Sequence, residues 1–380
     1  MHKNILSKRE RIELALNFKE ADRVPIFDVL QNVAVIEHYS GEKLEGYSFP
    51  IKTIGKAAQA FLDMTRGIEY FWPYEPHTTR FDDGFVLEWD RETAWISKRP
   101  FRDIKELKEY IKRNIEELNN YKNEEQWNYF GKISLSNGSR GIKSSNYKKE
   151  FLKKQKYFKD MVIFHNESPI GLDSAFNRAG LELFSYSYFE YPDLISEWID
   201  AFNRHEINRV NDIGEKYDLY GLSPVALVYC DLAYKTGLIF SPEFLKKEFF
   251  QRAKKLVDTW HKYNIKCIFH SDGDYRSILD DLVLAGYDGI HSMEPLAGWD
   301  LGQVKKQHSE LVLIGNIDIS QLLPNGTLQE VIAATKVAID NAARGGGYIL
   351  ATCSEIHNSC KLENIIAMVE TAWKYGKYEN

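Results

Sequence analysis

Residues 266–272 read Lys-Cys-Ile-Phe-His-Ser-Asp, an apolar run that ends in an imidazole and is followed two positions later by a carboxylate. Three later apolar runs also end in a residue that could bind a metal or move a proton: Gly289-Ile-His-Ser-Met-Glu294, Leu311-Val-Leu-Ile-Gly-Asn316 and Tyr348-Ile-Leu-Ala-Thr-Cys353. Short apolar runs of this length are typical of buried strands. Helical patterns separate them, so the second half of the chain predicts repeated strand–helix units.

The same alternation extends toward the amino terminus. We expect a helix at 7–17, with Ser7 as N-cap and Glu10 at capping-box spacing. Further strands are expected at 23–28, at 67–72, at 161–165 and within 220–231. Eight strands separated by helices favour a (β/α)8 barrel over a doubly wound sheet. The carboxyl ends of barrel strands open onto one face, so we place the active site there.

Length and composition favour a single domain. A chain of 380 residues that is 44% hydrophobic can bury a large core, and we interpret residues 1–380 as one barrel with a helical extension in front. Residues 85–97 predict a hairpin. The segment 104–160 is lysine-rich and polar, with too few apolar positions to bury much, so we interpret it as an insertion or lid.

Charge and cysteine content restrict the ligands. A net charge of -6 gives no broad positive field for nucleic acid or an anionic membrane, which leaves a small molecule or a protein partner. The first residues enter a charged helical pattern, and no apolar run has membrane-spanning length, so we expect a cytoplasmic protein. The four cysteines form no CxxC pair and are expected to be free thiols or ligands. A homodimer is left open.

The strand ends supply a plausible metal set. His270, Asp272 and Cys353 would meet at the open face, with Glu294 beside them. Imidazole, carboxylate and thiolate are zinc ligands, and three protein ligands plus an open position describe a catalytic site. The plainer alternatives are that His270 is a hydrogen-bonded structural residue and that Cys353 is a small buried hydrophobe.

Other polar residues stand at the same face. We assign proton transfer to Glu294, Asp231 and Asp28, and substrate binding to His165, Glu167, Asn316 and Trp72. Each of the acidic residues could instead cap the helix that follows it. Most aromatic side chains are expected in the core, while Trp72 and Trp299 lie close enough to predicted loops to line a pocket for a planar ligand.

Several motifs together resemble the uroporphyrinogen decarboxylase superfamily. They are Arg9-Glu-Arg-Ile-Glu-Leu-Ala-Leu16, Asp22-Arg-Val-Pro-Ile26, Asp231-Leu-Ala-Tyr-Lys-Thr-Gly237, Phe240-Ser-Pro-Glu-Phe244, His270-Ser-Asp-Gly-Asp274, Glu294-Pro-Leu-Ala-Gly-Trp-Asp300, Gly315-Asn-Ile-Asp318 and Glu363-Asn364. The likeness runs nearly end to end and is most specific from about 180 to 375. It implies a (β/α)8 barrel with the active site in its mouth.

The resemblance implies one of two chemistries. True decarboxylases of the superfamily carry an arginine-rich stretch after the first strand for the carboxylates of their substrate, whereas residues 28–37 contain no arginine. The zinc methyltransferases, which work with corrinoid proteins, show a His-x-Cys ligand pair and a second cysteine at the last strand. His270 and Cys353 match this pattern, and Asp272 stands where the middle cysteine would be. Either Asp272 or Glu294 completes the ligand set, or the metal has been lost.

A carboxylate in place of a thiolate makes a harder metal site that is less suited to binding a thiol. We therefore predict that zinc activates a small methylated donor, preferably an aryl methyl ether, for methyl transfer to the cobalt of a partner corrinoid protein. Glu294 or Asp231 would supply the proton. The alternatives are a metal-free lyase that uses Asp28 or Asp231, and a non-catalytic barrel that binds a ligand or a corrinoid protein.

Overall fold

The computed structural model describes residues 6–45, 50–66, 75–90, 94–120 and 144–378. Its main sheet has six parallel strands in the order β6, β7, β10, β11, β12, β13. Their bounds are His165–Pro169, Val225–Tyr229, Lys266–His270, Gly289–Ser292, Val312–Ile317 and Tyr348–Thr352. The strands predicted in the second half of the chain are therefore confirmed.

Further parallel contacts join the two sides of this sheet. β1 (Met64–Thr65) pairs with β5 (Val162–Ile163), and a single residue separates β5 from β6. Isolated parallel bridges connect Ile26 with Leu350 of β13 and Phe27 with Met64 of β1. Strand contacts can thus be followed from β6 to β13, through residues 26–27, and back to β5. The predicted strand at 67–72 lies outside the described residues.

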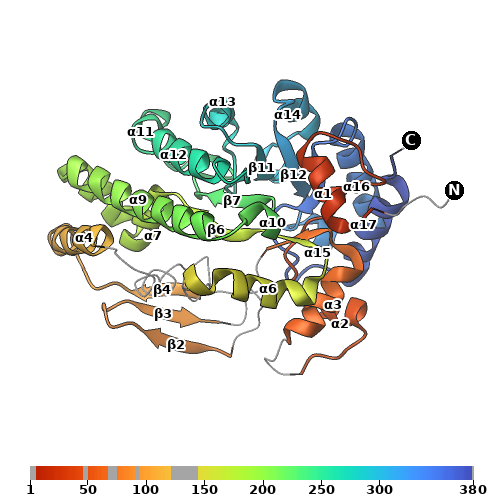
Figure 1. The fold of residues 1–380 in the computed structure, drawn as a ribbon, viewed down its shortest axis with the longest axis horizontal. Coiled ribbons are helices and arrows are strands. Elements are labelled where there is room, and N and C mark those ends of the chain that lie inside the picture. Colours follow the sequence, from red (N-terminus) through yellow and green to blue (C-terminus); the bar gives the residue numbers. More distant parts are fainter. Residues whose placement is uncertain (1–5, 46–49, 67–74, 91–93, 121–143, 379–380) are drawn as a thin grey trace.

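Helices cover the outside of the strands (Figure 1). Those before β7 are α1 Lys8–Leu16, α2 Val33–Ser40, α3 Ile51–Phe61, α4 Ile104–Asn119, α6 Tyr147–Phe158, α7 Gly171–Ala179, α8 Leu181–Glu190, α9 Pro192–Lys216 and α10 Leu219–Leu222. Those after it are α11 Pro242–Glu248, α12 Phe250–His261, α13 Leu279–Leu284, α14 Leu301–Gln307, α15 Leu322–Asn325, α16 Leu328–Ala342 and α17 Leu362–Tyr375. The sequence of residues 242–263 has the pattern of one helix, but the helix is divided at Phe249 into α11 and α12. No helix in the described ranges is both long and apolar enough to cross a membrane.

Short elements decorate this frame. The 3-10 turns are η2 Ser144–Asn146, η3 Arg276–Ile278 and η4 Pro295–Ala297. β2 (His77–Arg80), β3 (Val86–Trp89) and β4 (Ala94–Lys98) form an antiparallel sheet beside the main strands, which confirms the predicted hairpin and adds a strand to it. β8 (Ala233–Tyr234) and β9 (Gly237–Leu238) form a small hairpin after β7.

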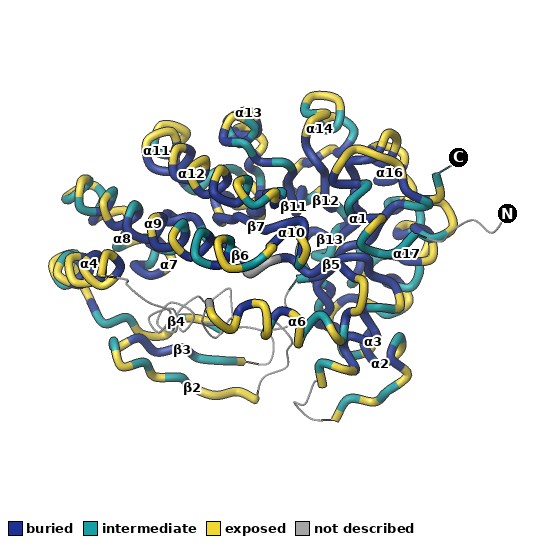
Figure 2. Tube along the Cα trace, viewed as in Figure 1, coloured by how far each residue is buried: buried dark blue, intermediate teal, exposed yellow. Residues whose placement is uncertain are grey.

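Alternation along the strands divides their apolar side chains between two clusters. The first, called the inner cluster, takes every second strand residue: Phe27, Val29, Met64, Val162, Phe164, Val225, Leu227, Ile268, Val312, Ile314, Ile349 and Ala351. The residues between them, such as Val228, Phe269 and Leu313, join a larger set, called the outer cluster, with the buried faces of the helices. The strands are therefore buried on both faces, as in parallel sheets covered by helices, and Figure 2 shows them as the buried centre of the molecule.

Helix α1 closes one end of the inner cluster. Ser7 caps it and forms the predicted capping box with Glu10. Ile12 and Leu16 then pack in the inner cluster with Val225 and Val312, which are the first residues of β7 and β12. Because α1 covers the amino ends of the strands, a site formed by side chains of the inner face has to lie at their carboxyl ends.

The expectation that 104–160 buries little is wrong for the described parts of that segment. α4 buries Leu107, Ile111 and Ile115 against the other helices, and α6 buries Tyr147 and Phe151. The apolar residues of α4 recur every three or four positions, so one face is apolar although the overall composition is polar. Residues 121–143, between these helices, lie outside the described part of the chain.

Candidate active site at the carboxyl ends of the strands

Strand alternation places the predicted residues on one face. Ile268, Ile314 and Ala351 belong to the inner cluster. Two positions beyond each of them lies a predicted site residue: His270 in β10, Asn316 in β12, and Cys353 directly after β13. Since successive strand side chains alternate between faces, these three continue the inner face toward the carboxyl ends. The same argument places Arg66 there, two positions beyond Met64.

His270 contacts Asp272 and a second histidine. Its Nε2 lies 3.9 Å from Asp272 Oδ1, and its Nδ1 lies 2.8 Å from Nδ1 of His291. Both imidazoles are buried, at 9% and 1% exposure. Burial lowers the pKa of His270 well below the usual histidine value, and His291 and Arg66 lower it further. Burial, with Arg66, also lowers the pKa of His291 to about 3. Both rings are therefore neutral near pH 7.

A group of carboxylates surrounds Asp272. Burial among protein atoms raises its pKa to about 7, and the negative charges of Asp231, Glu294 and Glu355 add to this shift. Burial also raises the pKa of Asp231, although the residue as a whole remains open to solvent. Such mutual repulsion would be relieved by a cation or by protons.

Glu294 is held in place from two sides. Its Oε1 accepts a hydrogen bond from the backbone N–H of Gly273 at 2.9 Å, and its Oε2 lies 3.8 Å from Lys235 Nζ. The preceding residues Ser292 and Met293 have φ angles of 92° and 52°. Such values are uncommon for residues with a side chain and persist where surrounding contacts hold them. They end β11 before Glu294, which the sequence pattern had placed within the strand.

Cys353 is the buried thiol of this group. Burial raises its pKa well above the usual thiol value, and the nearby negative charges of Glu294, Asp318 and Asp272 act in the same direction. All four cysteines are free and buried. Cys230, Cys267 and Cys360 belong to the outer cluster. Cys353 lies outside that cluster, and its pKa is the one raised by both Asp272 and Glu294.

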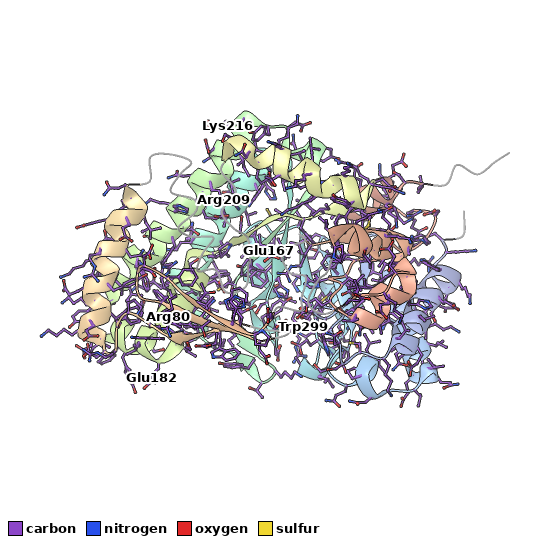
Figure 3. The ribbon with its side chains drawn as sticks, turned by 90° about the horizontal axis from the view of Figure 1, so that it is seen from below. Arg80, Glu167, Glu182, Arg209, Lys216 and Trp299 are labelled. Carbon is purple, nitrogen blue, oxygen red and sulfur yellow. The ribbon has the colours of Figure 1, made fainter. Side chains whose placement is uncertain are left out.

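The remaining predicted residues have different surroundings. Glu167 is nearly buried and forms an ion pair with Arg66; Figure 3 shows Glu167 near the middle of the molecule. Trp299 donates from Nε1 to the carbonyl of Gly273. His165 begins β6, but its side chain is outside the description, as is Trp72.

Asp28 is fully buried away from solvent. Its carboxylate accepts hydrogen bonds from the backbone N–H groups of Thr352 and Val29 and from the Thr352 hydroxyl. Burial raises its pKa to about 8. This residue links the first strand segment to β13, and its oxygens are not exposed at the strand ends.

The residues at the strand ends fit a zinc ion in donor type. Two ligands about 2 Å from one tetrahedral ion lie roughly 3.3 Å apart, so the His270–Asp272 separation needs only a small closure. The donor atoms of His270, Asp272 and Cys353 do not all lie within 4.8 Å of one another. Within the described residues, the group that meets this limit is His261, Cys267 and Asp288.

That second group lies at the amino ends of β10 and β11 and is internally satisfied. Asp288 already binds His261 Nε2, Lys266 Nζ and the Cys267 backbone N–H, each at 2.8 Å. A metal would have to displace the lysine ammonium. We therefore keep His270, Asp272 and Cys353 as the candidate set.

Three residues at the site were missed by the sequence analysis. His291 lies inside an apolar run. The feature that could have identified it is a polar side chain within a buried strand, two positions after Gly289. Arg66 directly precedes the predicted strand at 67–72. Asp173 lies in the first turn of α7, and its carboxylate accepts a hydrogen bond from the backbone N–H of Asp231 at 3.2 Å. Burial raises the pKa of Asp173 to about 8, and Asp231 contributes to the shift.

One family model matches the part of the chain that carries most of the candidate site. The model of the uroporphyrinogen decarboxylase (URO-D) family matches residues 225–375, which span β7 to α17. The resemblance to the uroporphyrinogen decarboxylase superfamily is confirmed. The matched residues include His270, Asp272, Glu294 and Cys353, so the candidate site lies largely within the URO-D region.

Two methyltransferases are similar over more of the chain. Methylcobamide:CoM methyltransferase MtbA of Methanosarcina mazei is 23% identical over 276 residues, which cover 72% of this chain and 73% of that protein. A solved methyltransferase structure from Methanosarcina mazei superimposes with a TM-score of 0.65 at 18% identity, over 97% of this chain and 99% of that one. The latter likeness shows a shared α/β fold, and both relatives carry the name methyltransferase.

Proposed function

We propose that this protein is a zinc-dependent methyltransferase built on a (β/α)8 barrel. It would transfer a methyl group from a small methylated donor, preferably an aryl methyl ether, to the cobalt of a corrinoid protein. The observation that carries the proposal is the approach of His270 Nε2 to Asp272 Oδ1, 3.9 Å apart at the carboxyl end of β10. The similarity to methyltransferases supports the reaction class.

The strand register supports the meeting of His270 with Cys353. Pairing runs from His270 to His291, then to Ile314 and to Ile349, and Cys353 lies four residues beyond Ile349. In a (β/α)8 barrel the register shifts by about one residue per strand. Three strands of such a barrel would account for about three of the four residues, which supports a similar level for His270 and Cys353 on the inner face.

His270, Asp272 and Cys353 are the residues that would hold zinc, with Glu294 as the alternative carboxylate. The bound ion would polarise the oxygen that carries the methyl group.

Asp231 is the preferred proton donor. Its raised pKa keeps a larger share of it protonated near neutral pH, and solvent reaches it for reprotonation. As the carbon–oxygen bond of the donor breaks, its electron pair stays on the oxygen, which takes the proton of Asp231. The methyl carbon passes to cobalt(I), which supplies the new bonding pair. Glu294, held by Gly273 and Lys235, is the alternative donor. Glu167, Asn316, His165 and Trp72 are proposed to contact the methylated substrate.

A second candidate is methyl transfer from a methylated corrinoid to a thiol, which the name of the relative MtbA suggests. Asp272 argues against it, because a carboxylate makes the metal less suited to binding a thiol. The metal-free lyase is further disfavoured, since Asp28 is enclosed by Thr352 and Val29. The lid role of 104–160, a homodimer and a cytoplasmic location remain predictions.

Methyl transfer can be tested by spectroscopy. Purified protein is mixed with cob(I)alamin and, in separate reactions, anisole-type ethers, methylamines and methanol, and cobalt methylation is followed by absorbance. The expected result is methylation from an aryl ether that is lost in Cys353→Ala and retained in Cys360→Ala, a matched buried cysteine of the outer cluster. Methylation of a thiol by methylcobalamin, with none of the ethers active, would favour the second candidate.

A further inference from the structure

The contact between His270 and His291 carries an inference about the metal ligand itself. The two residues are paired in register on β10 and β11. Their rings lie 4.9 Å apart between centroids, at an angle of 30°, and the two Nδ1 atoms are 2.8 Å apart. Phe27 packs edge-on against His291 with its centroid 5.2 Å away. Both rings are therefore fixed by strand pairing and packing.

A distance of 2.8 Å between two imidazole nitrogens requires that one donates and the other accepts. Two tautomer arrangements satisfy this condition. In the first, His270 Nδ1–H donates to His291, which leaves His270 Nε2 with a free lone pair and puts the His291 proton on Nε2. In the second, His291 donates, and the proton of His270 occupies Nε2, the nitrogen that faces Asp272. Only the first arrangement lets His270 bind a cation through Nε2.

The surroundings of His291 favour the first arrangement. The backbone carbonyl of Thr352 stabilises the protonated form of its ring, and a carbonyl oxygen can only accept a proton. His291 Nδ1 already faces His270, and His291 Nε2 is buried and forms no hydrogen bond of ordinary geometry. We infer that Nε2 is the ring nitrogen whose protonation the Thr352 carbonyl favours, because Nδ1 is engaged by His270.

We propose that His291 is a positioning residue that fixes His270 in the Nδ1–H tautomer and thereby presents the Nε2 lone pair to a divalent metal. The metal role rests on the proposed function, whereas the tautomer does not. Acceptors that hold the second ring nitrogen of a metal-binding histidine typically change metal affinity by about 10- to 100-fold when removed.

Nuclear magnetic resonance tests the tautomer without a metal. Long-range proton–nitrogen spectra of ¹⁵N-histidine-labelled protein distinguish a protonated from a bare ring nitrogen, and His270→Gln and His291→Asn assign the signals. The expected result in the zinc-free protein is His270 protonated on Nδ1 and His291 protonated on Nε2. The reverse pattern overturns the proposal, whatever the activity of the protein.

Zinc affinity, measured by competition with a chromophoric chelator, tests the metal role. His291→Phe keeps an aromatic ring and removes the acceptor, and is expected to weaken zinc binding by roughly 10- to 100-fold. His291→Asn places an amide oxygen near the former Nδ1 and should recover part of that loss. Thermal melts check that both variants are folded. Wild-type affinity in folded His291→Phe overturns the metal role. Failure of wild-type protein to bind zinc overturns the proposed function, and the tautomer spectrum then decides the histidine pairing by itself.

Discussion

Asp28 and Thr352 join the first and last strands of the molecule through two hydrogen bonds of 3.0 Å, from the Thr352 backbone N–H and from its hydroxyl. Asp28 belongs to the segment that bridges β13 and β1. Isolated bridges at Ile26 and Phe27 make the parallel contacts of this segment with β13 and β1. The buried Asp28 side chain therefore lies next to a connection that few residues make. Its environment gives it a stability role that can be measured separately from any reaction.

Stability is expected to depend on pH through Asp28. Its pKa is raised to about 8 in the folded protein, against about 3.9 in an unfolded chain. Between these values the folded state holds a proton that the unfolded state has lost, so stability is full below about pH 4 and falls as pH rises toward 8. Denaturant unfolding should show a fall of roughly 1 kcal/mol per pH unit in this range. Asp173 and Asp272 also have raised pKa values and add to the fall in wild-type protein. Asp28→Asn should therefore make the profile shallower by about the amount given for Asp28, and an unchanged profile in that variant would contradict its role.

The identity of residue 272 is expected to set the metal chemistry. Asp272→Cys supplies the thiolate that His-x-Cys methyltransferases have, and softer ligands bind zinc more tightly. We expect zinc affinity to rise roughly tenfold, while methylation of cobalt from aryl ethers falls because the ion becomes a weaker Lewis acid. Asp272→Asn serves as the matched control and should lose affinity. Equal ether activity in the aspartate and cysteine forms would show that residue 272 does not touch the ion.

The ion pair between Arg66 and Glu167 is expected to stabilise the fold only as a pair. Their side chains are 13% and 4% exposed. Arg66→Ala removes the guanidinium beside the buried carboxylate of Glu167, and the loss of one member of a buried ion pair costs about 3 kcal/mol or more. The double variant Arg66→Met, Glu167→Leu removes both charges and should recover most of this stability in urea unfolding. A double variant as unstable as the single one would mean that the charges themselves are required.

The capping box of α1 gives a smaller and more local prediction. The Ser7 hydroxyl accepts from the Glu10 backbone N–H at 3.2 Å, and Glu10 Oε2 accepts from the Ser7 backbone at 2.8 Å. Ser7→Ala should reduce the free energy of unfolding by about 1 kcal/mol. Glu10→Gln keeps an acceptor at that position and should cost less. A neutral Ser7→Ala would show that the capping box does not contribute to the stability of the protein.

The strands of the second half could be predicted because each is apolar, short and bounded by a helix. β12 and β13 follow the predicted runs within one residue. Burial on both faces makes such strands uniformly apolar, so the pattern does not reveal which residues face inward. For this reason His270 and Cys353 were predicted from their place at strand ends, whereas His291, enclosed within a run, was missed.

Two other predictions failed because contacts between distant parts of the chain decide which residues are buried. The lysines of α4 concealed an apolar face that includes Leu107 and Ile111, and that face packs in the core. Asp28 was expected to be catalytic because it ends a strand, and its hydrogen bonds with Thr352 depend on a residue more than 300 positions away. No local pattern specifies that partner.

The central claim is that His270, Asp272 and Cys353 bind one zinc ion at the carboxyl ends of the strands. Anomalous scattering at the zinc edge from a crystal of the purified protein tests it most directly. The account predicts a single strong peak about 2.0 Å from His270 Nε2 and about 2.3 Å from Cys353 Sγ. No peak there, or a peak between His261, Cys267 and Asp288 instead, would contradict it.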